Sequence, residues 1–340
     1  MRTMILDRTF DRWPGRVVRG LRRRYNDECV TILTYHSISC EPSLFTAARG
    51  LRHDPEDFER EIDYLARHYH VISMRELVES LERGEKARRA VVLTFDDGYA
   101  DCLSKAMPIL YRRRLPMTVF PVTSTIGNRD LLWQHKLAWL ESEGHADPVW
   151  SLLKKHGWTN QNHGDTLHDY VRQNYTAAIP LLLEDALKSI GTSGPELAFE
   201  HKLYVSPEDM ARTDPDFVEF GNHTDTHPVL SALSTARQMA EIGIARRRLQ
   251  EITGRPPIAF AYPFGLKRHY DDTTRRLAVE TGHRAIVDMR RRVNAGVVDP
   301  RDLSRKPAPC ESQLEFEKMI ESWPANAQVL RPEEPRDAEV

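Results

Sequence analysis

The chain of 340 residues has no closely spaced cysteine pair, no excess of charge of one sign and little overall hydrophobicity. Its four cysteines include no Cys-x-x-Cys pair, which favours reduced thiols, although Cys29 and Cys40 could still form a disulfide. The 48 basic and 50 acidic residues give a net charge of -2, so charge indicates no nucleic-acid partner. A mean hydropathy of -0.54 excludes a chain embedded mainly in a membrane.

The N-terminal segment lacks the apolar stretch of a signal peptide, because Arg or Asp recurs every few residues from Met1 to Leu21. We therefore expect a cytoplasmic protein. The basic arm 1–28 mixes aromatic and aliphatic residues with Arg, as interfacial anchors do, and peripheral contact with the inner face of the membrane is one expectation for it. A packed or flexible arm is the default alternative. The polar tail 324–340 is predicted to be disordered.

Strand-like and helix-like segments alternate from residue 29 to residue 323, which predicts one α/β domain. The count of about seven strands does not by itself distinguish a closed barrel from an open sheet. The predicted strands are 30–35, 70–72, 90–95, 117–122, 217–220, 258–262 and 284–287, and the predicted helices are 55–68, 74–83, 99–113, 234–252, 271–281 and 312–322.

Two adjacent carboxylates, Asp96 and Asp97, follow the apolar run 90–93 and precede Gly98. The run predicts a strand buried on both faces, and α/β folds place their chemistry at the carboxyl ends of such strands. Repulsion between neighbouring carboxylates favours separate roles, with Asp97 on a metal ion and Asp96 as a general base. The residues alone leave the order of these roles open, and Asp-Asp-Gly can also be a simple turn signal.

Two imidazoles, His223 and His227, follow the short predicted strand 217–220. A spacing of four places both rings on one side of a helical turn, within reach of one ion. Two His and one Asp leave positions open for water, as catalytic metal sites do. Zinc is the default ion for this set, and other divalent ions are compatible with it. Taken alone, the two His could also be a structural pair at a helix start.

Two strings resemble the first and second motifs of the polysaccharide deacetylases of carbohydrate esterase family 4, namely Thr94-Phe95-Asp96-Asp97-Gly98 and His223-Thr224-Asp225-Thr226-His227. The resemblance implies that Asp96 is the catalytic base and that Asp97, His223 and His227 are the metal ligands. It also implies a distorted (β/α) barrel, often of seven strands.

A third string, Ala261-Tyr262-Pro263-Phe264-Gly265, resembles the family's Arg-x-Pro-Tyr/Phe-Gly motif but has Ala261 in place of Arg. In the similar proteins this Arg orients the catalytic base, so Asp96 must be held by a group that the sequence does not identify. The resemblance implies an oxyanion-hole role for the backbone N–H of Phe264. We assign Tyr262 and Pro263 to substrate contact. A plain Pro-Phe-Gly turn is the alternative for this string alone.

The general acid is the largest departure from the family pattern, which usually supplies it from a C-terminal Leu-x-His string. The nearest string is Leu303-Ser304-Arg305, and no His follows His283. Our candidate is His36, which ends the predicted strand 30–35 and is expected at the same rim as Asp96. A hydrogen-bonded rim or core His is the alternative. Asp288 matches the fourth motif too poorly to be assigned a role.

The interval between Asp97 and His223 is far longer than one strand and one helix require, so residues 127–200 are predicted to be an inserted, mainly helical subdomain. Helices are expected at 131–142 and 178–189. Four of the six Trp residues lie in this interval, and their rings could stack on sugars. Packing of these Trp residues in a helical core is the favoured alternative. They are Trp133, Trp139, Trp150 and Trp158.

These inferences predict a metal-dependent hydrolase that removes N-acetyl groups from an amino sugar in a glycan, polysaccharide or glycolipid precursor. The expected partner is the acetylated amino sugar, and no nucleic acid is expected. The lost Arg and the lost Leu-x-His leave a hydrolase of non-sugar amides as one alternative. A catalytically impaired glycan-binding protein is another, although a decayed site would be expected to lose its metal ligands first.

Overall fold

The computed structural model describes residues 29–46, 50–85, 89–155, 167–296, 298–309 and 312–321. The arm 1–28 and the tail 324–340 lie outside these ranges, as do Trp158 and Cys310. Cys40 and Cys102 are free thiols, and Cys29 and Cys40 form no disulfide with each other. In the described part of the chain, no helix combines the length and the apolar character needed to cross a membrane.

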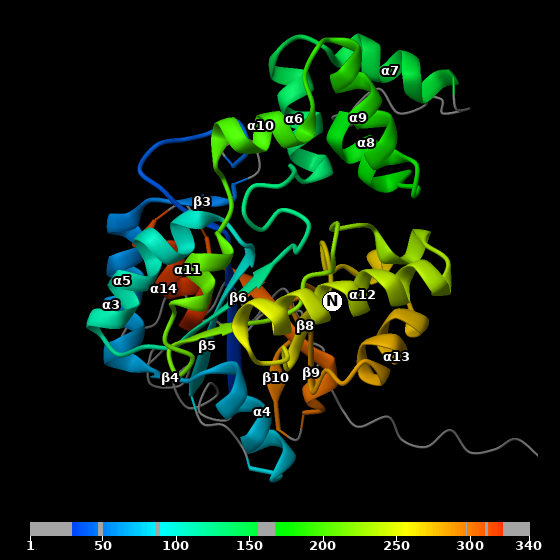
Figure 1. Cartoon of the computed structure of the whole chain (residues 1–340). Coiled ribbons are helices and arrows are strands. Elements are labelled where there is room, and N and C mark those ends of the chain that lie inside the picture. Colours follow the sequence, from blue (N-terminus) through cyan, green and yellow to red (C-terminus); the bar gives the residue numbers. More distant parts are fainter. Residues whose placement is uncertain are drawn as a thin grey trace, which may run out of the picture.

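Seven parallel strands form one curled sheet, which confirms the predicted distorted (β/α) barrel (Figure 1). The order across the sheet is β7-β6-β5-β1-β11-β9-β8. Two short strands pair at its side, β4 (His70–Val71) with β5 and β10 (Asn294–Ala295) with β1, while β2 (Ser37–Ile38) and β3 (Arg52–His53) pair separately. The seven strands are β1 (Cys29–Tyr35), β5 (Ala90–Asp97), β6 (Met117–Pro121), β7 (Val218–Phe220), β8 (Ala259–Ala261), β9 (Ala285–Asp288) and β11 (Leu303–Pro307).

The two edges of the sheet meet at Asn222, immediately after β7. The backbone N–H of Asn222 donates to the Ala259 carbonyl on β8, and the N–H of Ala261 donates to the Asn222 carbonyl, each at 2.9 Å. One residue earlier, the N–H of Gly221 donates to Val119 on β6 at 2.8 Å. The segment that leads into His223 therefore joins both edges of the sheet and closes the barrel.

Alternation along the strands decides which side chains enter the barrel. On β5, Val91 and Leu93 pack in the outer core, whereas Ala90 and Val92 belong to the cluster inside the barrel. Because side chains alternate between the two faces of a strand, Asp96 continues the inner row. All eight residues of β5 are buried, as the apolar run predicts.

Helices cover the outside of the sheet on both sides (Figure 1). The helix α3 (Pro55–His68) has the predicted bounds, and its N-cap Asp54 accepts from the backbone N–H of Glu56 at 2.9 Å. The apolar face of α3 packs with α14 (Gln313–Glu321) over β1 and β5. The helices α12 (Thr235–Thr253) and α13 (Asp272–Glu280) cover β8 and β9, and α4 (Met74–Glu82) packs against the apolar cluster inside the barrel.

The helix predicted over 99–113 is not a regular α-helix. Residues Cys102–Ala106 form a π-helical turn, and only Met107–Arg112 continue as the helix α5. Pro108 has no backbone N–H to donate to the preceding turn. Immediately before it, the Met107 N–H donates to the Cys102 carbonyl, which is the i to i+5 bond of a π-helical turn. A wide turn thus accommodates the proline without ending the helical path.

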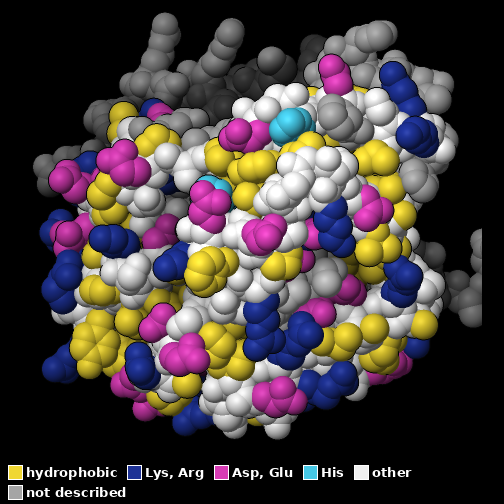
Figure 2. Space-filling view, turned by 45° about the horizontal axis from the view of Figure 1, so that its top comes forward, with side chains coloured by type: hydrophobic (Ala, Val, Ile, Leu, Met, Phe, Trp, Pro, Cys, Tyr) yellow, Lys and Arg dark blue, Asp and Glu magenta, His cyan; other side chains and the backbone are white. Residues whose placement is uncertain are grey.

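Six helices separate β6 from β7 in the described residues, and five of them, α6 to α10, form a layer over the carboxyl end of the barrel, whereas α11 lies at its side (Figure 1). The apolar core of this layer includes Trp133, and the partly buried Trp139 and Trp150 pack against it, as in the core-packing alternative. Acidic and basic side chains are interspersed over the face shown in Figure 2. The helices are α6 (Trp133–Ser142), α7 (Ala146–Lys155), α8 (Leu167–Gln173), α9 (Ile179–Ser189), α10 (Gly194–His201) and α11 (Pro207–Ala211).

We predict that Gly98→Ala destabilises the protein more than Gly254→Ala. Both glycines have positive φ, at 72° and 71°, so both substitutions carry a backbone cost of about 1 kcal/mol. A Cβ at Gly98 would lie 2.6 Å from the Pro121 Cβ, whereas nothing lies within 4 Å of a Cβ at Gly254. Overpacking should add about 1–3 kcal/mol to the loss at Gly98. Equal losses in urea unfolding would contradict the close contact.

Candidate metal centre and active site

Asp96 and Asp97 end β5 at the carboxyl edge of the barrel. Asp97 has a φ of 65°, which is uncommon for a residue with a Cβ, and Gly98 follows with a φ of 72°. The extended backbone of β5 therefore ends at Asp97, and the side chains of Asp96 and Asp97 point in different directions from it. Positive φ in a side-chain-bearing residue is often found where function requires a particular orientation.

The loop that carries both histidines is held by bonds to several elements. The N–H of His227 donates to the Thr224 hydroxyl at 3.0 Å, and both residues have positive φ, at 58° and 69°. The Glu241 carboxylate on α12 accepts from the backbone N–H groups of Asp225 and Thr226 at 3.0 and 2.8 Å. Because these bonds fix the backbone, the two rings reach the carboxyl end of β5 in defined positions.

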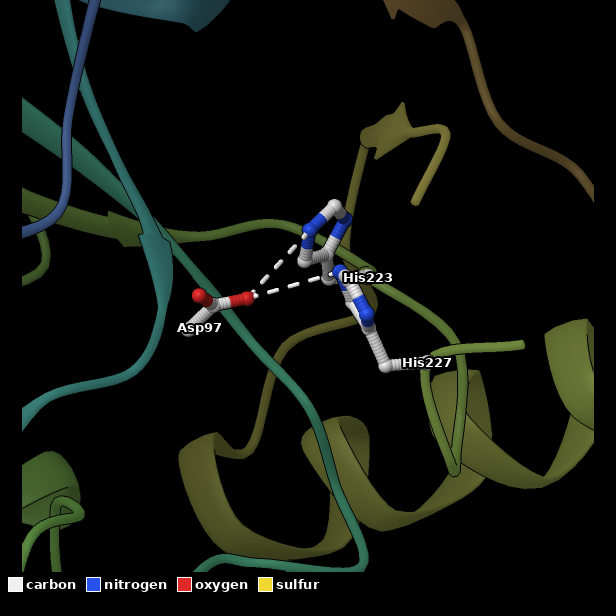
Figure 3. A group of neighbouring side chains, drawn as sticks. All are labelled: Asp97, His223 and His227. Carbon is white, nitrogen blue, oxygen red and sulfur yellow. Dashed lines mark ion pairs between the residues drawn. The ribbon is translucent and has the colours of Figure 1, made fainter. Parts of the chain in front are cut away.

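Asp97, His223 and His227 face one another across the barrel end (Figure 3). The Asp97 Oδ1 lies 3.8 Å from His223 Nε2 and 3.5 Å from His227 Nε2, and the three ligand atoms lie within 4.8 Å of one another. Donors at 2.0–2.2 Å from one tetrahedral ion are separated by roughly 3.3–3.6 Å. The three buried residues therefore fit a divalent metal ion.

The outer nitrogen of His223 supports the same conclusion. Its Nδ1 lies 2.8 Å from the Ala261 carbonyl, which can only accept a hydrogen bond, so Nδ1 carries the proton and Nε2 is available as a ligand. Burial lowers the pKa of His223 and favours the neutral imidazole. A neutral ring with an accepting partner on its outer nitrogen is the usual form of a metal-ligating histidine.

Asp96 is held by Arg305, a residue to which the sequence assigns no role. Arg305 Nη1 and Nη2 donate to the two carboxylate oxygens of Asp96 at 2.6 and 2.7 Å, and the Arg305 side chain is fully buried. Burial would raise the pKa of Asp96, but the Arg305 guanidinium holds it below the usual value, so the carboxylate is ionised. The guanidinium thus supplies, from β11, the support expected from the absent Arg at position 261.

A pocket of about 520 Å³ opens over this centre, a size typical of small-ligand sites. Asp96, both histidine ligands and the candidate acid His36 line it. The barrel supplies further lining residues, whereas α6 and α8 of the inserted subdomain supply an opposite set. The barrel set includes Tyr262, Phe264, Met289 and Arg305, and the inserted set is Gln134, Ala138, Glu141, His168, Asp169 and Arg172.

The third motif turns at the pocket wall. Phe264 has a φ of 60° and packs its ring against His227, with 4.7 Å between the centroids. Tyr262 also lines the pocket, with its ring stacked on Tyr270 at 3.8 Å. Pro263 is buried in the turn, and it is not among the described residues that line the pocket. The structure therefore brings Tyr262 and Phe264, but not Pro263, to the pocket surface.

His36 lies at the carboxyl end of β1, in the same pocket as Asp96, as the sequence predicts for its position. Burial lowers the pKa of His36 to about 4, and the Asp96 carboxylate opposes this shift. The imidazole is therefore neutral before substrate binds.

Sequence reasoning missed two polar groups of the centre, Arg305 and Gln134. No strand is predicted over 303–307, because Leu303 is its one strongly apolar side chain. The available signal was an Arg two positions after Leu303, which places both on the same face of a strand. For Gln134, whose amide contacts His227, no motif exists, since this contact joins residues 93 positions apart.

The chain belongs to the polysaccharide deacetylase family, whose sequence profile matches residues 83–286, more than half of the chain. YxkH of Bacillus subtilis (strain 168), provisionally named a polysaccharide deacetylase, is 29% identical over 115 residues, which cover 33% of this chain and 39% of YxkH. The poly-beta-1,6-N-acetyl-D-glucosamine N-deacetylase of Staphylococcus epidermidis is 23% identical over 161 residues, covering 44% and 53% of the two chains. The chain thus spans about half the length of these relatives or less.

Solved structures share the fold at low sequence identity. The Streptococcus pyogenes deacetylase PplD, in complex with acetate, superposes with a TM-score of 0.58 at 19% identity, covering 87% of this chain and 100% of that one. IcaB from Ammonifex degensii superposes with a TM-score of 0.55 at 16% identity, covering 86% and 96%. Both likenesses extend over most of the chain and support the distorted barrel.

We predict that Arg305→Met lowers the free energy of unfolding by about 3–5 kcal/mol, because it leaves the Asp96 carboxylate buried without its cation. Adding Asp96→Asn should recover a large part of this loss, since the uncompensated charge is then gone. Chemical denaturation of the four proteins of this double-mutant cycle measures both effects. Strictly additive losses would show that the two side chains are not coupled.

Proposed function

We propose that the chain is a metal-dependent hydrolase that removes N-acetyl groups from amino sugars of a glycan. The observation that carries this proposal is the Asp96 carboxylate, held ionised by Arg305 beside the ligand set Asp97, His223 and His227 in one pocket. The name of the staphylococcal relative, a poly-beta-1,6-N-acetyl-D-glucosamine N-deacetylase, supports acetylated glucosamine as the substrate class.

We propose zinc as the resident ion, because two imidazoles and one carboxylate form a donor set that suits it. When bound, such an ion supplies Lewis acidity, which makes a water molecule more acidic and polarises a carbonyl. The three protein ligands leave positions for water and substrate, as catalytic sites require.

The protein's own groups fit the remaining steps of amide hydrolysis. Asp96 lies 3.9 Å from His223 Nε2 and, as an ionised carboxylate, can take the proton of the attacking water. The backbone N–H of Phe264, in the turn beside His227, is our candidate donor to the oxyanion of the tetrahedral intermediate. Arg305 fixes the orientation of the base and has no direct part in the bond changes.

His36 is our candidate for protonating the leaving amine. Among the described residues, four imidazoles line the pocket: two belong to the proposed ligand set, and His168 stacks on Trp133 with 5.7 Å between centroids. His36 is the remaining one and lies on the barrel near Asp96. Because it is neutral at the start, His36 would take up the proton that Asp96 removes from the water and pass it to the nitrogen as the C–N bond breaks.

The location of the protein also stays a proposal. A cytoplasmic deacetylase whose basic arm 1–28 contacts the inner face of the membrane would reach lipid-linked sugars. This proposal rests on the sequence of the arm alone.

Acetate release tests the proposed reaction. We expect the zinc-loaded protein to release acetate from N-acetylglucosamine oligomers, with one free amine formed per acetate. Asp97→Asn and His227→Ala should each reduce the rate by more than about 100-fold, since even outer-shell partners of a metal typically contribute 10–100-fold. A chelator should abolish the activity of the wild type, and zinc should restore it.

A parallel panel of small non-sugar amides separates the alternatives. Release of acetate from these amides, but not from the sugar oligomers, would replace the proposal by a non-sugar amide hydrolase. Oligomer binding without any hydrolysis by the metal-loaded protein would indicate a glycan-binding protein.

We predict that His36→Gln lowers kcat for acetate release by about 10²–10⁴-fold, the usual contribution of a general acid. Zinc affinity should be unchanged, because His36 is not among the three ligand residues. His168→Gln is the matched control, since it removes a second pocket imidazole from the inserted subdomain. A His36→Gln variant with the kcat of the control would exclude His36 as the acid.

A further inference from the structure

Three consecutive residues at the start of α6 join the inserted subdomain to the metal centre. The Trp133 Nε1–H donates to the His227 carbonyl at 3.0 Å, and the amide nitrogen Nε2 of Gln134 lies 2.5 Å from His227 Nδ1. His135 lies between two tyrosines, with its Nε2 2.8 Å from the Tyr99 hydroxyl and its Nδ1 2.6 Å from the Tyr204 hydroxyl.

We propose that Gln134 is a positioning residue for the metal ligand His227, so that the inserted subdomain sets the affinity of the site for its ion. This inference rests on the proposed metal site. It assigns a role to a residue outside the three sequence motifs, and to a subdomain that otherwise contributes only a wall of the pocket.

The neutral ring of His227 carries one proton, and its position follows from the contacts of the two ring nitrogens. Its Nε2 points toward the Asp97 carboxylate at 3.5 Å and is the ligand nitrogen, so in a neutral ring Nδ1 carries the proton. Nδ1–H then needs an acceptor, and the Gln134 amide provides one when its oxygen faces the ring. The amide nitrogen faces Nδ1 in the structure, and a 180° turn of the amide about its last bond puts the oxygen in the same position, where it accepts from Nδ1–H.

The two ligand histidines differ in how this need is met. His223 Nδ1 has a backbone partner, the Ala261 carbonyl, which belongs to the barrel itself. His227 has a side-chain partner from a different part of the chain, and its own backbone is in the positive-φ region. The orientation of the His227 ring is therefore the part of the centre that depends on the inserted helices.

His135 fixes the position from which Gln134 acts. Tyr99 follows directly after Gly98, so its bond to His135 ties α6 to the end of β5, where Asp97 lies. Tyr204 also accepts from the backbone N–H of Leu132 at 3.0 Å, which holds the first turn of the helix. Gln134 is thus placed between two fixed neighbours, and both Gln134 and His135 are buried.

The test is zinc affinity of the full chain, measured on the metal-free protein by competition with a chromophoric chelator. Gln134→Leu removes the acceptor with little change in volume, and we expect about 10- to 100-fold weaker zinc binding. Gln134→Glu keeps an oxygen acceptor with the same reach and should bind zinc nearly as tightly as the wild type. Gln238→Leu is the matched control, because Gln238 is equally buried but bonds Leu233 and Thr274 instead of a metal ligand.

Each outcome decides a separate point. Wild-type zinc affinity in Gln134→Leu would overturn the inference and leave the proposed function intact. Equal weakening in Gln134→Leu and Gln134→Glu would show that an oxygen acceptor at this position does not set the affinity, which also overturns it. Failure of the wild type to bind zinc would instead remove the metal site on which the inference rests. Thermal unfolding of the metal-free variants, compared with Gln238→Leu, separates loss of the acceptor from loss of the fold.

Discussion

The ion pair between Arg305 and Asp96 is the interaction on which the centre depends. An ionised carboxylate is costly inside a barrel, and the opposing guanidinium makes it tenable there. The same contact fixes both oxygens of the carboxylate beside His223 and leaves Asp97 as the carboxylate of the proposed ligand set. Because Arg305 lies on β11 and Asp96 on β5, with β1 between them, this pairing requires the sheet to be assembled.

The inserted subdomain and the barrel contribute different properties to the same site. The barrel supplies the three proposed ligands and the proposed base from strand ends or the loops that follow them, and Arg305 from within β11. The insert supplies the outer partner of His227 and the opposite wall of the pocket. The proposed reaction thus depends on the barrel for its reacting groups. The shape of the pocket and the orientation of the His227 ring depend on the inserted helices.

The sequence predicts the parts of this protein that are local. The apolar run before Asp96, the four-residue spacing of His223 and His227, and the capped helix at 55–68 all have signals within a few residues. Arg305 and Gln134 lack such signals, because their roles arise from contacts with residues 209 and 93 positions away. The π-helical turn before Pro108 was missed because a single proline does not specify how the helix before it adjusts.

The barrel closes through Asn222, and His223 is the next residue in the chain. Any fluctuation that separates the edge formed by β7 from β8 must therefore displace His223 relative to Asp97. Opening of the seam and release of an ion held by these residues are one event, so a bound ion would slow the exchange of the amide hydrogens that cross the seam. The residue that closes the barrel therefore also sets the position of a proposed metal ligand.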